Sequence, residues 1–346
     1  MKSFELKAFS KPSLNTRVKS DTVRGSERWI GFFLGPALVA TLYAAVSGSY
    51  LNTFYTDVLQ LSPVAGGLFL SLMPVVSKII DAITNIIMGR IVDNTTCVQG
   101  KARPWILLSG PLMAIAAVLM FAVPRGNVLI TAVWVVFSYN LFFSISYTMY
   151  NLSNVVTISL STRDNKQRDT LSMAASMGIN MVPGAILAVV FPSFILPFIG
   201  VDQNKWILVM GILALLAIPG VLFQYYFTRE RVTEEVRAGV AEEEKVEAVP
   251  LGKQIKACLS SKYWVLIIIA LIIYRFYENW QTTAMHYYAN WVLGTYNDGR
   301  TLTILNIIGQ AMLGPGVLIL WPLVKKFNKQ KVYVLGCVIA LIVSSL

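Results

Sequence analysis

Long apolar stretches alternate with short polar segments along most of this 346-residue chain. A helix needs about 20 apolar residues to cross the roughly 30 Å hydrocarbon core of a bilayer. Eight stretches reach that length, and a ninth begins near Val332 and continues to Leu346. The eight lie at 29–55, 64–90, 105–123, 128–158, 171–198, 206–227, 263–292 and 301–324. The pattern predicts a polytopic membrane protein that crosses the bilayer at least eight times.

Helices account for these stretches better than the strands of a membrane barrel do. Barrel strands are about 10 residues long and alternate in polarity, whereas these runs are much longer and apolar throughout. A helix also satisfies its own backbone hydrogen bonds in lipid. We therefore predict an all-α fold. Because a chain does not usually end inside a membrane-spanning run, we also expect this sequence to be a fragment or a truncated gene product.

The polar segments divide the chain into four predicted parts. They are a basic cytoplasmic tail at 1–28, an N-terminal six-helix bundle at 29–227, a cytoplasmic central loop at 228–262, and a partial C-terminal bundle at 263–346 with helices 7, 8 and part of 9. Six spans, a long loop and further spans are the layout of transporters built from two six-helix halves.

Composition and charge support this reading and orient the protein. The chain is 55% hydrophobic and 14% charged, which excludes an ordinary soluble domain. Alternating the spans places 24 of the 29 lysines and arginines on the side of the tail and three on the other. The positive-inside rule then predicts a cytoplasmic N-terminus in the plasma membrane. Topology explains the net charge of +11, so we expect the lipid bilayer as a partner and no nucleic acid.

The sequence offers no catalytic or metal-binding constellation. The chain has one histidine, three cysteines and no phosphate-binding glycine loop. We therefore expect no enzyme activity, no metal and no cofactor. The oligomeric state is left open.

Ionisable residues inside predicted spans are costly and mark functional sites. Lys78 and Asp81 lie three residues apart in the second span, and Arg275 and Glu278 repeat this spacing in the seventh. Each pair is either a structural ion pair or part of a solute or proton site in a polar cavity. We favour the site because an apolar pair would pack at lower cost. Asn85 shares the helical face of Asp81.

Polar residues also recur along the fourth and seventh spans. Those of the fourth span follow each other at steps of three or four and predict one polar stripe: Asn140, Ser144, Tyr147, Asn151 and Asn154. Such a stripe lines a water-filled path or bonds a neighbouring helix, and five in register favour the path. In the seventh span, Tyr277, Trp280 and Gln281 lie near Glu278. This mixture suits a polyhydroxylated ligand, and ordinary helix packing is an equal alternative.

Two segments around the loop after the second span resemble a known signature. They run from Asp81 to Thr95 (DAITNIIMGRIVDNT) and from Gly100 to Trp105 (GKARPW). They resemble the glycoside–pentoside–hexuronide:cation symporters, the melibiose-carrier branch of the major facilitator superfamily. The same family resemblance extends to the segments Tyr55-Thr-Asp57, Tyr147-Thr-Met-Tyr-Asn151 and Arg168-Asp-Thr170-Leu171. It covers the first six spans, and the later ones only in layout.

The resemblance implies a twelve-helix fold of two bundles, with a sugar-type solute at the midplane and uptake driven by a cation gradient. It also suggests conformational gating by five residues of the cytoplasmic loops: Gly89, Asp93, Lys101, Arg103 and Arg168. Gly89 would let helices approach closely, and Asp93, Lys101 and Arg103 would pair with the other half. The alternative for these charges is that they only set the topology.

The cation motif departs from the family pattern. The family has two acids four residues apart in the second span, where this chain has Asp81 and Asn85. Asn151 matches the acid of the fourth span, and a residue near Thr41 replaces the acid of the first. Sodium prefers anionic oxygen ligands. We therefore favour a proton carried by Asp81 over Na⁺ as the coupling ion.

The leading hypothesis is a secondary transporter that moves a sugar, glycoside or related polar solute by alternating access. One alternative is transport of a lysolipid or other amphiphile. An alternative from another class is a transporter-like membrane sensor or receptor that binds its ligand without moving it.

Overall fold

The computed structural model describes residues 4–6, 9, 11–47, 49–61, 64–239, 251–288, 292–294 and 329–345, with isolated positions between 304 and 327. The chain forms two compact units, one of Met1–Glu235 with Gly309–Leu346 and one of Val236–Ile308. Each unit is described by itself below.

The first unit consists of helices, several of which contain wide π-helical turns. The long helical segments follow in chain order. The first consists of η3 (Glu27–Leu34), α1 (Gly35–Val46), α2 (Ser49–Thr53) and η4 (Phe54–Val58), the second of η5 (Val64–Gly67) and α3 (Leu68–Asp93), and the third of α4 (Arg103–Phe121). The fourth consists of α5 (Val128–Asn140), η6 (Leu141–Tyr147) and α6 (Thr148–Ser161), the fifth of α7 (Asn165–Ala185), η7 (Ile186–Ile195) and α8 (Leu196–Ile199), and the sixth of α9 (Gln203–Tyr226). Shorter elements are η2 (Pro12–Leu14) and α10 (Arg231–Arg237), and α15 (Lys329–Ser345) follows near the end of the chain.

Five helices of the described residues are long and apolar enough to cross a membrane. They are Glu27–Val58, Leu68–Asp93, Arg103–Phe121, Val128–Ser161 and Gln203–Tyr226. These coincide with the first four predicted spans and the sixth, and the predicted fifth lies within the continuous helical run of α7, η7 and α8. The all-α polytopic prediction is confirmed. Among the described residues, the only strands are the parallel pair β1 (Phe4–Glu5) and β2 (Thr95–Thr96).

In the second unit, α11 (Leu251–Ser260) and α12 (Lys262–Tyr287) meet at an angle of 88° and together have the length and polarity of one broken span. They take the place of the predicted seventh span. Most of the predicted eighth span, 301–324, lies outside the described residues.

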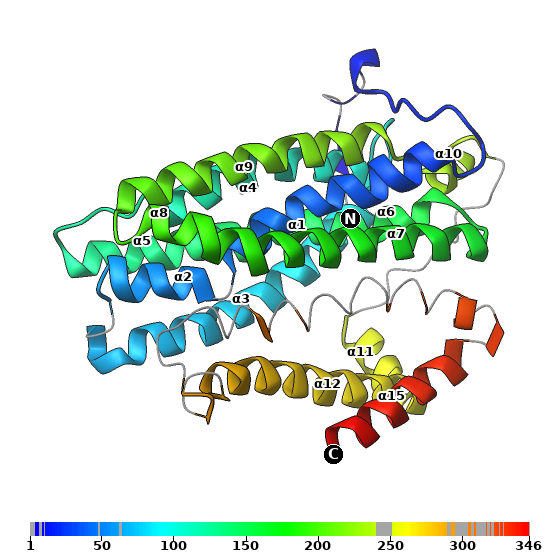
Figure 1. Ribbon diagram of the computed structural model, residues 1–346. Helices are drawn as coiled ribbons and strands as arrows, with labels where there is room; N and C mark the ends of the chain where they lie inside the picture. The colour runs from blue at the N-terminus through cyan, green and yellow to red at the C-terminus, as the bar shows by residue number, and fades with distance from the viewer. Residues whose placement is uncertain are drawn as a thin grey trace. The chain divides into compact units, whose positions relative to one another are not determined.

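Close helix contacts in the first unit are made at glycines. The helix α1 runs between α7 and α9, and α4 packs along α9 (Figure 1). A Cβ atom added to Gly35 would lie 2.9 Å from the Gly220 carbonyl oxygen, and one on Gly178 would collide with the Phe33 carbonyl. Small residues let the helix backbones meet in this way. Among the described residues, a Cβ atom on Gly89 would make only ordinary contact, 3.9 Å from Leu152, so the close approach predicted for Gly89 stays a prediction.

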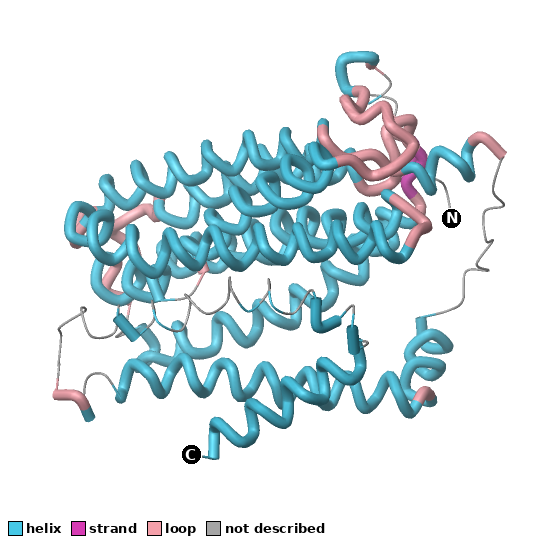
Figure 2. Tube along the Cα trace, turned by 45° about the vertical axis from the view of Figure 1, so that its right-hand side comes forward, coloured by secondary structure: helices cyan, strands magenta, loops and turns pink. Residues whose placement is uncertain are grey.

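The described part of the N-terminal tail belongs to the first unit. Its loops and the short strand pair gather at one end of the helices (Figure 2). The Thr16 hydroxyl donates to the carbonyl oxygens of Tyr226 and Thr228, at 3.2 and 2.8 Å. The Tyr225 hydroxyl donates to the Leu14 carbonyl at 2.9 Å. The tail is therefore tied to the end of α9, about 210 residues further along the chain.

A buried ion pair completes this attachment. Glu27 and Arg231 form a two-pronged contact, with distances of 2.9 and 3.1 Å. Both side chains are buried, and Arg231 also donates to the carbonyl oxygens of Ser20, Thr22 and Ser161. Arg231 begins α10, so the first residues of the predicted central loop belong to the helical unit. We call this set of contacts between the tail and 225–231 the clasp.

Candidate solute and coupling site

A polar cluster joins α3 to η6 within the first unit. The Lys78 ammonium lies 2.9 Å from Asp81 Oδ2. The Ser144 hydroxyl donates to Asp81 Oδ1 and also lies 3.1 Å from Asn140 Oδ1. The Asp81 side chain is 15% exposed and that of Lys78 is 67% exposed. Both carboxylate oxygens of Asp81 are therefore paired, while the cation beside them remains accessible.

Local helix geometry sets the positions of these groups. On α3, the spacing of three residues puts Lys78 and Asp81 on one face. The side-chain nitrogen of Asn85 donates to the Asp81 backbone carbonyl at 2.7 Å, so the side-chain oxygen of Asn85 takes no part in this bond. On the other helix, Ser144 lies in the wide turn η6. The hydroxyls of Ser146 and Thr148 bond the carbonyls five residues before them, at 2.6 and 3.2 Å, and so support this turn.

Aromatic rings border the cluster. The rings of Tyr43 and Tyr147 are stacked, with centroids 3.9 Å apart. Phe143 packs edge-on against Tyr43 and lies 4.5 Å from Tyr139. Tyr43 and Tyr139 are both within electrostatic range of the Lys78 ammonium. These two tyrosines could not be predicted from the sequence, because a single aromatic residue in an apolar span carries no signal that distinguishes a site from a lipid-facing surface.

One buried hydroxyl near this cluster lacks a hydrogen bond. The Tyr55 side chain is 2% exposed, and its hydroxyl has no partner among the described residues. It lies within electrostatic range of Tyr139. A buried polar group of this kind calls for a water molecule or a solute hydroxyl as its partner.

The predicted polar stripe of the fourth span is split. Asn140 and Ser144 belong to the Asp81 cluster, and Tyr147 stacks on Tyr43. Asn151 is exposed. Asn154 is buried and accepts from Gln224 Nε2 at 2.5 Å, so the helix-packing alternative applies to it. The wide turn η6 changes the number of residues per turn, which removes the alignment that steps of three and four would give a regular helix.

Asn154 takes part in a contact between α6 and α9. Gln224 on α9 donates to Asn154 and accepts from the Tyr150 hydroxyl at 2.7 Å. All three side chains are almost completely buried. The three groups satisfy each other and hold the two helices together.

The predicted residues of the seventh span lie on α12, in the second unit. Tyr277 and Trp280 are exposed, and the Trp280 ring lies 5.9 Å from that of Phe276. Arg275 lies in the same helix. The side chains of Glu278 and Gln281 lie outside the described part of the chain. A site shared between these residues and the Asp81 cluster stays a prediction.

The loop residues expected to act in gating are mostly bound within the first unit. Arg103 is buried, and its guanidinium donates to the backbone carbonyls of Gln99 and Tyr225 at 2.9 and 2.8 Å. These carbonyls bind it within the first unit, and its expected pairing with the other half stays a prediction. Asp93 is exposed, and Arg168 donates to the Thr162 carbonyl at 3.0 Å.

Glu230 contacts the same loop as Arg103, and sequence reasoning missed it. Its buried carboxylate accepts from the backbone N–H groups of Lys101, Ala102 and Arg103, at 2.7, 3.0 and 2.8 Å. These groups form the N-terminus of α4, where a negative charge is stabilised. Gly100 has a positive φ of 116°, and any Cβ there would collide with this carboxylate.

Comparison with known proteins agrees with this architecture. Residues 31–346 match a family described as MFS/sugar transport protein. An uncharacterized symporter of Bacillus subtilis, YnaJ, is 28% identical over 71% of this chain and 50% of its own length. The isoprimeverose transporter of Lactiplantibacillus pentosus is 24% identical over 85% of this chain and 58% of its own length. The raffinose carrier protein of Pediococcus pentosaceus is 23% identical over 78% and 42%. The chain thus spans roughly half the length of these relatives.

Proposed function

Because the chain belongs to the MFS/sugar transport family, within its glycoside–pentoside–hexuronide:cation symporter group, we propose that it acts in secondary transport of a sugar, glycoside or related polar solute. Alternating access of two helical halves would carry the solute across the membrane. The observation that supports this most is the Lys78–Asp81–Ser144–Asn140 cluster with its tyrosine border.

The chemistry of this cluster suits a polyhydroxylated solute. Carboxylate and amide oxygens accept hydrogen bonds from sugar hydroxyls, and the ammonium group donates to them. The Tyr147 and Tyr43 rings offer apolar surface for the C–H faces of a sugar ring. The Tyr55 hydroxyl supplies one further group, which has no hydrogen-bond partner among the described residues. On α12, Arg275, Tyr277, Glu278, Trp280 and Gln281 are proposed to contribute from the second half.

We propose a proton on Asp81 as the coupling ion. The unprotonated carboxylate forms a neutral pair with Lys78, which lowers the cost of both charges inside a membrane. Protonation would remove the ion pair and release the ammonium for the solute. The other oxygens around Asp81 come from amides and hydroxyls, at Asn85, Asn140 and Ser144, so Asp81 is the one anionic group of this cluster.

We further propose that the tail end of the first unit faces the cytoplasm and that the protein resides in the plasma membrane. The distribution of lysines and arginines supports this orientation. The clasp and the Glu230 contacts would then brace the cytoplasmic ends of the helices during the gating motion, with Asp93, Lys101 and Arg168 near the moving surface.

Uptake by purified protein in liposomes tests the proposed substrate class. Vesicles containing the full chain should take up labelled isoprimeverose or raffinose with saturation, and protein-free vesicles should not. Flux of labelled lysophosphatidylcholine without either sugar would overturn the proposal in favour of an amphiphile carrier. Sugar binding, measured by tryptophan fluorescence, without any uptake would instead identify a sensor.

A further inference from the structure

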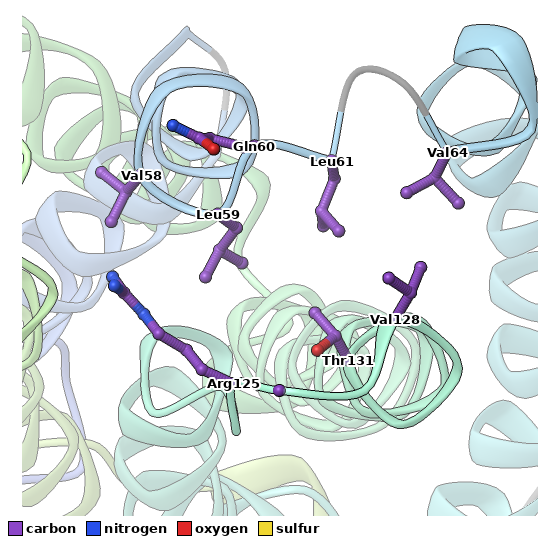
Figure 3. Close-up of a pocket in the computed structure, with 9 residues that line it drawn as sticks. Val58, Leu59, Gln60, Leu61, Val64, Arg125, Val128 and Thr131 are labelled. Atoms are coloured by element: carbon purple, nitrogen blue, oxygen red, sulfur yellow. The ribbon is translucent and has the colours of Figure 1, made fainter.

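Two features of the described residues lie outside the candidate solute site. One is a hollow of about 340 Å³ between the end of η4 and the start of α5, shown in Figure 3. Val58 and Leu61 beside it are buried in the core, and Arg125 Nε donates to Gln203 Oε1 at 2.5 Å. These contacts already account for the hollow, so we assign no ligand to it. The other feature is the sharp bend between α11 and α12 in the second unit.

The helix α12 is long enough to cross the membrane without α11. It has 26 residues, and a rise of about 1.5 Å per residue gives a length of about 39 Å. The hydrocarbon core is roughly 30 Å thick. The helix α11 has 10 residues and a length of about 15 Å, which is too short to span this core. A span formed by α12 therefore leaves α11 outside the hydrocarbon core.

The angle between the two helices places α11 near the plane of the membrane. It is 88°, and membrane-spanning helices are tilted by about 20° from the bilayer normal. Ser261 fixes the bend, because its backbone N–H donates to the Cys258 carbonyl at 3.1 Å and so ends α11. Its carbonyl accepts from the Val265 N–H at 3.1 Å, and its hydroxyl oxygen accepts from the Trp264 N–H at 3.5 Å. Ser261 thus also caps α12, with no longer linker between the two helices.

The first residues of α12 have the composition of a membrane–water interface. They are Lys262, Tyr263 and Trp264, and the Tyr263 and Trp264 side chains are 79% and 40% exposed. Tyrosine and tryptophan concentrate at the level of the lipid headgroups, and a lysine near a helix end extends its ammonium group to that level. The bend at Ser261 therefore belongs to the headgroup layer, and α11 continues from it along the membrane surface.

The sequence of α11 suits this position. Its apolar residues recur at the spacing of one helix face, at Leu251, Ile255, Cys258 and Leu259. Leu259 is 60% exposed although it is large and apolar. Lys253 and Lys256 are exposed, and residues 251–262 contain three lysines and no acidic residue. One apolar face and a basic polar face are typical of helices that lie in the membrane interface.

An anionic membrane surface is complementary to both faces of α11. Acyl chains would cover the apolar residues, and the phosphate groups of anionic lipids would attract the lysines. We propose that α11 lies in the headgroup layer, with its apolar face toward the acyl chains and with Lys253 and Lys256 at anionic phospholipid headgroups. The helix then tethers the start of the second unit to the membrane surface.

A fluorescent label at two neighbouring positions tests the orientation of α11 in the full chain. Cys258 lies on the apolar face, and Ala257 lies about 100° further round the helix, on the polar face. Bimane is attached at Cys258 in a Cys97→Ser, Cys337→Ser protein, or at position 257 after Ala257→Cys and Cys258→Ser in the same background. The shared background makes the two labelled proteins directly comparable.

In liposomes of phosphatidylcholine with brominated acyl chains and phosphatidylglycerol, the label at Cys258 should be quenched several-fold more than the label at position 257. Equal quenching of the two labels would overturn the proposed orientation. Quenching of neither label would show that another part of the protein, or a second copy, covers α11 in place of lipid. Neither reading depends on solute transport.

Substitution of the two lysines tests the role of anionic lipid. Lys253→Gln with Lys256→Gln should lower the ratio of membrane-bound to free α11 about 25-fold in liposomes that contain phosphatidylglycerol, since each basic residue contributes about fivefold. The fluorescence lifetimes of the label at Cys258 give this ratio. Lys253→Arg with Lys256→Arg is the matched control and should retain it. Equal losses in both double variants, or the same loss in pure phosphatidylcholine, would overturn the assignment to anionic lipid.

Discussion

At the scale of single residues, the Asp81 carboxylate is the central group of the first unit. Lys78 and Ser144 occupy its two oxygens, and Asn140 lies behind Ser144. A membrane-embedded carboxylate is costly to keep charged, so its partners determine when it can hold or lose a proton. The contacts of Asp81 therefore connect local helix geometry to the proposed coupling.

Removal of the Ser144 hydroxyl tests this connection. Ser144→Ala should raise the sugar concentration for half-maximal uptake by about tenfold or more, because a hydrogen bond to a charged group contributes about 1.5–3 kcal/mol. Ser138→Ala is the control, since the buried Ser138 hydroxyl bonds the Val135 carbonyl of its own helix and no other group among the described residues. Equal effects of the two variants in the liposome assay would show that Ser144 acts through packing alone.

Substitutions of Asn154 and Asn151 distinguish a residue that packs helices together from one that does not. Asn154→Ala should lower the free energy of unfolding by about 1–3 kcal/mol, because the buried Gln224 amide would lose its acceptor. Asn151→Ala, at an exposed position, should change it by no more than about 0.5 kcal/mol. Thermal unfolding in detergent measures both. A larger loss in Asn151→Ala would contradict the roles assigned to the two residues.

The sequence predicted only part of the candidate site. The spacing of Lys78 and Asp81 was sufficient to predict their pairing, because both lie on one regular helix. The split of the stripe was not predictable, since nothing in residues 141–147 marks them as a wide turn. Tyr43 and Tyr139 were missed because their role depends on packing between helices rather than on spacing within one.

At the scale of elements, the clasp makes the tail and α10 parts of the helical unit. Its contacts join residues about 200 positions apart, and no local pattern in the tail indicates them. The sequence pattern therefore predicts a polar tail and a loop, whereas their described residues bond to the helices in the structure. Hydrophobic periodicity located the spans, but it carries no information on polar contacts between distant segments.

The Glu27–Arg231 pair should contribute far more to stability than an exposed ion pair. Arg231→Met leaves the buried Glu27 carboxylate without its partner and should lower the free energy of unfolding by about 3–5 kcal/mol. Arg163→Met breaks the exposed Arg163–Glu235 pair and should cost no more than about 1 kcal/mol. Thermal unfolding and proteolysis of the tail distinguish the two. Similar unfolding temperatures for both variants would show that the clasp is not a stabilising contact.

Two glycine substitutions test the helix contacts. Gly178→Ala should destabilise the protein by about 1–3 kcal/mol, because the new methyl group meets the Phe33 backbone. Gly89→Ala has room and should be neutral or stabilise the helix by up to about 1 kcal/mol. Unfolding in detergent provides the comparison. A destabilised Gly89→Ala variant would instead support the close helix approach that the sequence predicts at Gly89.

At the scale of the whole molecule, hydropathy predicted the membrane class and most span positions of the first unit. These properties are local, and the bilayer sets the length of each span. The relation between the two units is a different matter, because the sequence pattern says nothing about which faces of two bundles meet. The α12 residues are therefore proposed for the solute site from the transporter architecture of the family.

Proton-driven accumulation is the most direct test of the proposed function. Liposomes containing the full chain, loaded at alkaline pH and diluted into acidic buffer, should accumulate labelled isoprimeverose or raffinose above the external concentration. Asp81→Asn should abolish this accumulation while retaining exchange of internal for external sugar. Accumulation that follows a sodium gradient instead, or that survives Asp81→Asn unchanged, would contradict the account.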